Sequence, residues 1–182
     1  MLTRLEEMSG QACWYAVHTR SRFDQRVASE LGSRGFESYF PAYEEIHQWK
    51  DRKKKVAVPL FPGYVFVRFA DSPGLRLRIL HTAGVARILG NGGMIEAVPD
   101  EEIEAVQGLL RANVPYHAHP FLREGVQVRV KRGALKGLEG TLVRFKNRAR
   151  LVISVALIAQ SVAAEVDIRD VEPVGSSRRF AA

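Results

Sequence analysis

The sequence predicts an α+β protein built from two small domains, and three observations carry this prediction. Residues 14–110 alternate short aromatic or β-branched runs with segments of helical periodicity. Residues 122–175 hold four short runs of strand type that are separated by glycines. Between them, residues 113–121 (NVPYHAHPF) carry two prolines and no apolar period. We therefore expect an N-terminal antiparallel sheet flanked by helices, joined to a small C-terminal five-stranded β-barrel.

The expected boundaries follow these changes in composition. From the N-terminus they give a polar leader, a first domain, a linker, a second domain and a tail, over residues 1–12, 13–112, 113–121, 122–175 and 176–182.

Strands of the first domain are predicted wherever aromatic and β-branched residues gather. The runs that meet this description are residues 14–19, 36–41, 64–69 and 84–89. A helix is expected over residues 99–110, where Asp100 is the N-cap and the acidic first turn suits the helix dipole.

An earlier helix is predicted directly after the first strand. Its apolar stripe recurs every four residues, at Phe23, Val27 and Leu31. Ser21 and Asp24 have the spacing of a capping box that would start this helix. Gly32 and Gly35 are expected to end it, because glycine accepts the left-handed conformation of a helix C-terminus.

The strand over residues 64–69 carries bulky side chains on both of its faces. Val65 and Val67 share one face, which we assign to the domain core. Tyr64 and Phe66 share the other face. Periodicity alone favours a core role for these two rings as well, and the alternative is an interface that binds a partner.

Charge is distributed unevenly along the chain, whose formal net charge is +7. Residues 1–120 hold 15 Lys and Arg against 14 Asp and Glu, whereas residues 121–182 hold 12 against 6. Within the first domain, residues 48–56 form a basic run that belongs in a solvated loop or hairpin tip. Such asymmetry indicates two modules with different partners, and a basic balance favours polyanions.

Several classes of protein are excluded by composition. Residues 1–13 lack the apolar stretch of a secretory signal, and no window approaches the roughly 18 apolar residues of a membrane span. The single cysteine, Cys13, cannot form an internal disulfide. His117 and His119 lie between prolines without a cluster of further ligands. We therefore expect a cytoplasmic monomer that is not an enzyme, has no cofactor or metal, and does not bind membranes.

Three segments together resemble the NusG family of transcription factors. They are WYAVHTRSRFDQRVASEL at residues 14–31, KVAVPLFPGYVFVRF at residues 55–69, and the KOW-like EGVQVRVKRGALKGLEGTLVRF at residues 124–145. The resemblance implies an N-terminal NGN-type domain that binds the clamp helices of the largest RNA polymerase subunit. It also implies a C-terminal SH3-like KOW barrel that recruits other factors.

The resemblance assigns roles to particular residues. Polymerase binding falls on the aromatic residues Tyr64, Phe66 and Phe61. Upstream or non-template DNA is expected to meet the basic residues His18, Arg20, Arg22, Arg26, Lys53, Lys54 and Lys55, because such side chains neutralise phosphates. The alternative for this basic set is a solvated charged face.

In the second domain, the resemblance implies a partner loop for the ribosomal protein NusE and for Rho. The matching positions are Leu157, Ile158 and Gln160. Family members carry arginine where Gln160 stands, and an amide does not replace a guanidinium. The alternative role for Leu157 and Ile158 is the barrel core.

The predicted function is a bacterial elongation factor that suppresses pausing and termination and recruits a partner such as the ribosome. The missing arginine favours a specialised antitermination paralogue, similar to RfaH, UpxY and LoaP. One alternative is a housekeeping NusG that supports Rho-dependent termination. Another is an RNA- or ribosome-binding KOW protein without a polymerase role. The alanine-rich residues 156–164 would tolerate helix, but the glycines of this domain favour the barrel.

Overall fold

The computed structural model describes residues 10–49, 52–91, 93–112, 114, 116–119, 125–145 and 148–174. The chain divides into two compact units, one of Met1–Ile103 with Ala156–Ile158 and one of Glu104–Val155 with Ala159–Ala182. The division falls inside helix α3 (Asp100–Arg111). The domain limits expected from composition, 13–112 and 122–175, therefore stay a prediction.

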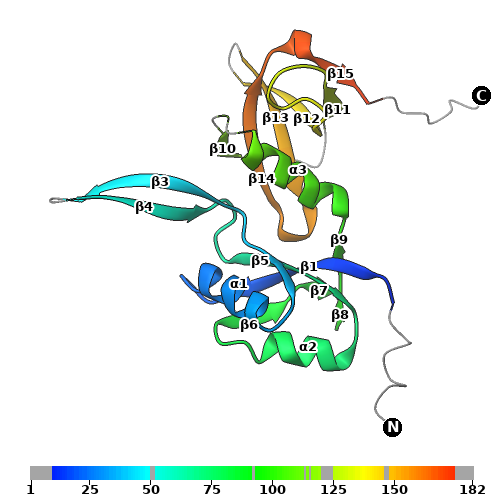
Figure 1. Ribbon diagram of the computed structural model, residues 1–182. Coiled ribbons are helices and arrows are strands. Elements are labelled where there is room, and N and C mark those ends of the chain that lie inside the picture. Colours follow the sequence, from blue (N-terminus) through cyan, green and yellow to red (C-terminus); the bar gives the residue numbers. More distant parts are fainter. Residues whose placement is uncertain are drawn as a thin grey trace, which may run out of the picture. The chain divides into compact units, whose positions relative to one another are not determined.

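An antiparallel sheet forms the centre of the first unit (Figure 1). Its strands lie in the order β2-β5-β1-β6. Strand β9 pairs with the start of β1, at Trp14 and Tyr15. Their bounds are β1 (Ala12–Thr19), β2 (Glu37–Tyr39), β5 (Tyr64–Ala70), β6 (Val85–Ile88) and β9 (Ala97–Val98). Strand β1 therefore lies between β5 and β6, so the segment predicted first from the sequence runs through the middle of the sheet.

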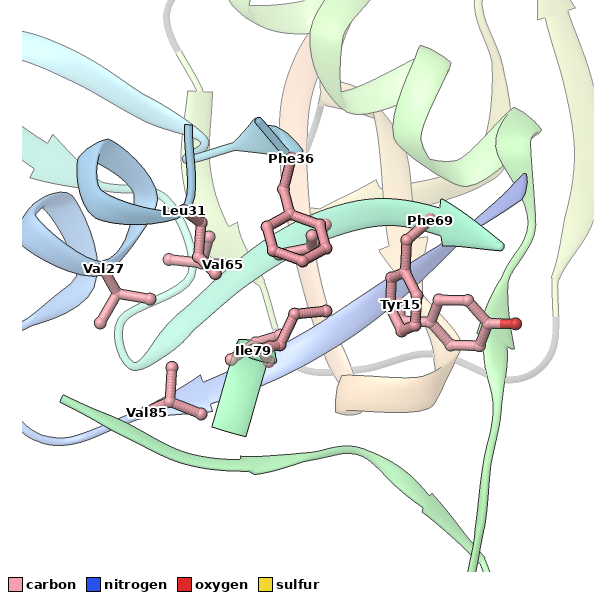
Figure 2. Packing of buried hydrophobic residues seen from close by; sticks show 10 residues of the cluster. Tyr15, Val27, Leu31, Phe36, Val65, Phe69, Ile79 and Val85 are labelled. Carbon is pink, nitrogen blue, oxygen red and sulfur yellow. The ribbon is translucent and has the colours of Figure 1, made fainter. Parts of the chain in front are cut away.

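One face of this sheet and two helices enclose the hydrophobic core shown in Figure 2. The helices are α1 (Asp24–Ser33) and α2 (Pro73–Leu80). The core side chains come from alternate positions of β1 and β5 and from the elements that cover them: Tyr15, Val17, Val65, Val67, Phe69, Val27, Leu31, Phe36, Ile79 and Val85. The predicted assignment of Val65 and Val67 to the core is confirmed.

Helix α1 ends just before Gly35, as expected, but Gly32 lies inside the helix, and the helix starts differently. At its end Gly35 has φ +87°, and the Phe36 N–H donates to the Leu31 carbonyl at 3.1 Å, a pattern typical of a glycine-terminated helix. At its start, Phe23 is the N-cap and makes no side-chain capping bond. The predicted capping box is wrong, because the Asp24 carboxylate is buried and bonded to other segments of the chain.

Helix α2 was missed by the sequence interpretation. Ser72 is its N-cap and accepts a hydrogen bond from the Leu75 N–H at 3.4 Å, and Pro73 occupies the first turn. Serine followed by proline is a known start signal for helices. That signal was present in the sequence, although the helix contributes only Ile79 to the fully buried core.

Two smaller antiparallel pairs complete the first unit. The basic run predicted as a loop or hairpin tip lies in the hairpin of β3 (Ala42–Trp49) and β4 (Arg52–Pro59), which projects as a ribbon (Figure 1). Strands β7 (Gly90–Asn91) and β8 (Met94–Ile95) form the other pair. The β3–β4 pair forms a separate two-stranded sheet. The chain before β3 and the chain after β4 connect it to the rest of the unit.

The second unit contains an antiparallel sheet in the order β10-β14-β13-β12-β11-β15. The bounds are β10 (Tyr116–His119), β11 (Val126–Val130), β12 (Glu139–Phe145), β13 (Arg148–Val155), β14 (Gln160–Val166) and β15 (Val171–Pro173). Short 3₁₀ helices, η1 (Ala156–Ile158) and η2 (Ile168–Asp170), connect the last strands. The alanine-rich segment is therefore mainly strand, as the barrel interpretation expected.

The expected α+β class with an N-terminal and a C-terminal sheet is confirmed, but two details are corrected. The C-terminal sheet has six strands among the described residues instead of five. The additional strand is β10, which lies inside the predicted linker and pairs with β14. Without β10, the backbone N–H and C=O groups along one edge of β14 would have no strand partner. Because β10 bonds to these groups, the segment between the two prolines forms a strand. In the described part of the chain, no helix is long and apolar enough to cross a membrane.

Candidate functional site

The face of the sheet opposite the core carries a row of aromatic rings. Phe66 stands on β5, with Ala16 of β1 and Tyr39 of β2 as its register partners on either side. The Tyr39 ring centroid lies 6.4 Å from that of Phe66, and the Phe61 ring meets Phe66 edge to face at 6.5 Å. The alternation predicted for residues 64–69 therefore holds, and β5 presents aromatic side chains on both faces.

These rings differ in exposure. Phe66 and Phe61 are 0% and 1% exposed, whereas Tyr64 is half-buried. The full burial of Phe66 agrees with the core role that periodicity favours for this ring. The contacts of Phe66 with the Tyr39 and Phe61 rings remove part of its apolar area from water. Any role of these three residues in binding polymerase stays a proposal.

Tyr64 is in direct contact with His18 of β1. The two residues are register partners, and their ring centroids lie 5.4 Å apart with a 54° angle between the planes. His18 is half-buried. His18 is a candidate for nucleic-acid binding, and Tyr64 is a candidate for polymerase binding. Because their rings are in contact, the two candidate surfaces are adjacent.

A cavity of about 860 Å³ opens at the corner where β1 meets α1. Its charged and polar wall includes His18, Arg20 and Arg22. Its apolar wall comes from segments far away in the sequence, namely Phe40, Val56, Ala57, Pro59 and Pro62. The cavity therefore joins the predicted basic corner to the base of the basic β3–β4 hairpin.

The structure brings together only some of the seven basic candidates. His18, Arg20 and Arg22 line the cavity. The Arg26 guanidinium carbon instead lies 5.9 Å from the centroid of the Phe23 ring. Lys55 forms an exposed ion pair with Glu44 at 2.8 Å, and the hydrogen bond to that carboxylate raises the pKa of Lys55 above its ordinary value.

The side chains of Lys53 and Lys54 lie outside the described residues. Sequence reasoning missed Gln25, Phe40 and Val56 of the cavity lining. Neither periodicity nor composition marks these three, because the turns that bring α1, β2 and β4 together are set by tertiary contacts.

Arg68 lies at the far end of the aromatic face. Its guanidinium reaches Glu37 at 3.8 Å and Asp100 at 3.5 Å, and Glu37 is also its register partner. Its Nε atom is buried without a hydrogen-bond partner among the described residues. Charged groups therefore limit the aromatic face at this end, while His18 and the cavity limit it at the other.

The predicted partner loop of the second domain spans η1 and the start of β14. Ile158 is 6% exposed, and Leu157 and Gln160 are half-buried. Ala159, between them, has φ +50°, an uncommon left-handed conformation for a residue with a side chain. Leu157 and Ile158 lie in the connection between β13 and β14, and Gln160 is the first residue of β14. Their role as a partner loop stays a prediction.

Other candidate chemistry finds little support. Among the described residues, no group of three or more His, Cys, Asp or Glu side chains is arranged to hold a metal ion. The side chains of His117 and His119 lie outside the described part. The Cys13 thiol is half-buried and donates to the Gln11 carbonyl at 3.6 Å.

Comparison with known proteins gives concordant matches. A family model described as "Transcription termination factor nusG" matches residues 12–107. The transcription termination/antitermination protein NusG of Thermus thermophilus is 28% identical over 177 residues, which cover 87% of this chain and 96% of the relative. The protein of that name from Staphylococcus aureus is 27% identical over 185 residues, covering 92% and 99%.

A solved structure, "Domain interaction in Thermotoga maritima NusG", matches with a TM-score of 0.50. The match covers 91% of this chain and 98% of that chain at 18% sequence identity. At this identity the likeness supports the fold.

Proposed function

Because this chain belongs to the NusG family of transcription termination and antitermination factors, we propose that its first unit docks on elongating RNA polymerase. The docking partner is the pair of clamp helices of the largest polymerase subunit. Bound there, the protein suppresses pausing and termination, and no chemistry is catalysed.

The aromatic face of the N-terminal sheet supports this proposal. An interface favours large, rigid rings, because they bury apolar area with little loss of side-chain entropy. Of the three residues assigned to polymerase binding, Tyr64 is the partly accessible ring, and it makes the first contact with the partner. Phe66 and Phe61 form the apolar floor beneath it, and the family's signature segment PLFPGYVFV supplies all three.

The test is co-purification with polymerase of the chain carrying Tyr64→Ala. We expect binding to be lost while the fold is retained. Tyr43→Ala is the matched control, since Tyr43 is an exposed tyrosine on β3, outside the sheet that carries the aromatic face. Wild-type recovery of polymerase by Tyr64→Ala would contradict the proposed docking surface.

Phe66→Leu is the second variant of this experiment. Leucine keeps an apolar side chain at the fully buried position, so the variant retains a folded sheet better than alanine would. We expect it to weaken polymerase binding while leaving the circular dichroism spectrum unchanged.

The cavity at the β1–α1 corner supports a second contact, with exposed non-template or upstream DNA. Arginine side chains neutralise phosphates without sequence preference, and apolar walls accept the faces of bases. Arg20 and Arg22 hold the backbone of a single strand, and Phe40 and Val56 face its bases. This assignment places nucleic acid beside His18 and hence beside the polymerase-docking ring.

The connection from β13 to β14 recruits a partner through Leu157 and Ile158, together with Gln160 at the start of β14, and the ribosomal protein NusE is the expected partner. Gln160 offers no charged donor, so stimulation of Rho is expected to be weak. We therefore propose a specialised antitermination paralogue. A Rho-dependent termination assay decides: clear stimulation of Rho would identify a housekeeping factor instead.

The excess of basic residues over residues 121–182 favours a second candidate, an RNA- or ribosome-binding protein without a polymerase role. Pull-down with polymerase after nuclease treatment separates the two. Recovery of polymerase supports the elongation factor, and loss of all recovery supports the RNA-binding alternative.

A further inference from the structure

Hydrogen bonds link Thr19 and Gly63 to the buried carboxylate of Asp24 and to each other. Asp24 is the first residue of α1 and is 7% exposed. The Thr19 hydroxyl donates to one carboxylate oxygen, and the Gly63 N–H donates to the other at 3.0 Å. The Thr19 N–H in turn donates to the Gly63 carbonyl at 2.9 Å. The end of β1, the start of α1 and the turn before β5 are therefore held together by one closed set of bonds.

The turn in question places Tyr64. The Tyr64 N–H donates to the Phe61 carbonyl at 3.2 Å, which closes a four-residue turn with Pro62 and Gly63 at its centre. Gly63 has φ +86°. Proline at the second position and a left-handed glycine at the third are typical of a type II turn.

Type I and type II turns differ mainly in the direction of the central peptide group, which here carries the Gly63 N–H. An acceptor fixed on one side of that peptide therefore selects one turn type over the other. Asp24 supplies this acceptor, and the carboxylate makes the bond stronger than a neutral acceptor would.

We propose that Asp24 is a positioning residue for β5, the strand that carries Tyr64. Its carboxylate holds the Pro62–Gly63 turn so that the Tyr64 ring lies against His18 and is accessible to the polymerase. The inference deepens the proposed function and rests on it for the partner. A simple helix-start role for Asp24 is a different reading, because it requires only negative charge near the first turn of α1.

Nuclear magnetic resonance on the full chain tests the positioning directly and needs no polymerase. In Asp24→Ala, we expect the Gly63 amide proton to shift upfield, because its hydrogen bond to a carboxylate is lost. Cross-relaxation between the His18 and Tyr64 rings should weaken at the same time. Asp24→Asn keeps one acceptor oxygen and should retain part of both signals, whereas a pure charge effect would make it resemble Asp24→Ala.

Thr19→Val removes the other bond to Asp24 and leaves the Gly63 bond in place. We expect its Gly63 amide shift to stay near the wild-type value. Unchanged Gly63 and Tyr64 signals in Asp24→Ala would overturn the inference, whatever the effect of that variant on stability.

Polymerase affinity provides the functional arm. The affinity is measured well below the unfolding temperature of each variant. We expect Asp24→Ala to bind polymerase about tenfold more weakly than the wild type, and Asp24→Asn to recover part of the loss. Asp71→Asn is the matched control, because Asp71 pairs with Arg76 at the surface, away from the turn. An equal loss in Asp71→Asn, or none in Asp24→Ala, would refute the role of Asp24 in docking.

A wild-type chain that fails to bind polymerase would refute the proposed function and with it the docking role. The resonance measurements would still decide whether Asp24 sets the turn. The two failures are therefore distinguishable.

Discussion

Arg34 and Arg78 each donate a guanidinium hydrogen bond to the backbone carbonyl of the other residue. The Arg78 Nη2 atom lies 2.9 Å from the Arg34 carbonyl oxygen, and the Arg34 Nη1 atom lies 3.3 Å from the Arg78 carbonyl oxygen. These bonds join the end of α1 to α2. The Arg78 guanidinium carbon also lies 4.9 Å from the centroid of the buried Phe36 ring. The two arginines therefore link α1 to α2 beside the buried Phe36 ring.

Replacing Arg78 by alanine is expected to lower the free energy of unfolding by about 1–2 kcal/mol, since a carbonyl bond and a cation–π contact are lost. Urea denaturation measures the change. Arg87→Ala, at an exposed position on β6, should stay within about 0.5 kcal/mol of the wild type. Equal effects of the two substitutions would show that this link between the helices contributes nothing.

Three glycine-to-alanine substitutions should separate backbone strain from steric overlap. Gly84 has φ +96°, and an added Cβ would lie 2.8 Å from Cβ and Cγ of Phe23. We expect a loss of about 3 kcal/mol from strain and overpacking together. Gly35 has φ +87° in open space and should lose only about 1 kcal/mol. Gly74, in open space within α2, should be neutral or slightly stabilised.

Thermal unfolding of the three variants gives their order. A Gly84→Ala variant that is no less stable than Gly35→Ala would mean that Phe23 can move aside at little cost.

Two rings of the aromatic face are expected to differ in what they contribute to stability. Phe66→Ala removes a fully buried ring and should cost about 3–5 kcal/mol. Tyr64→Ala affects a half-buried ring and should cost about 1 kcal/mol. Urea denaturation of each variant checks the difference. A similar cost for both would indicate that Tyr64 belongs to the structural core, which would weaken its assignment as the docking ring.

Single-stranded DNA binding is expected to depend on salt through Arg20 and Arg22. For each of these arginines changed to alanine, the slope of log K against log salt should fall by about 0.7 in magnitude, because one phosphate contact is lost. Fluorescence anisotropy with a labelled oligonucleotide measures the slope. Arg26→Ala should change it less, since Arg26 lies against Phe23 and does not line the cavity.

The pH dependence of the second unit should include one unusually acidic carboxyl group. Hydrogen bonds from the Arg169 side chain and, next in size, from its backbone N–H lower the pKa of Asp167 to about 2. The folded-state pKa is below the unfolded value, so the folded state binds fewer protons and stability rises with pH. This contribution is complete above about pH 4 and is lost as the pH falls through about 2.

A carboxyl-carbon titration checks this value. Arg169→Gln should move the pKa of Asp167 back towards its ordinary range, while Arg132→Gln, at an exposed position elsewhere in the unit, should leave it unchanged. An ordinary pKa for Asp167 in the wild type would contradict the ion pair.

By itself the sequence determined the elements that depend on neighbours along the chain. The alternation of Val65 and Val67 with Tyr64 and Phe66 identified a two-faced strand, because side chains of a strand point to opposite sides. The left-handed requirement at Gly35 placed the end of α1, because that conformation is set by local sterics. The order of these elements and their motifs also identified the family.

Tertiary structure decided everything that depends on segments far apart. Asp24 looks like a helix cap in the sequence, yet its carboxylate bonds to Gly63, 39 residues away. Phe40 and Val56 reach the same cavity as Arg20 only after the sheet and hairpin have formed. Burial of Phe66 likewise depends on rings from other segments. A local pattern records which way a side chain points, and only the packed chain determines what it meets there.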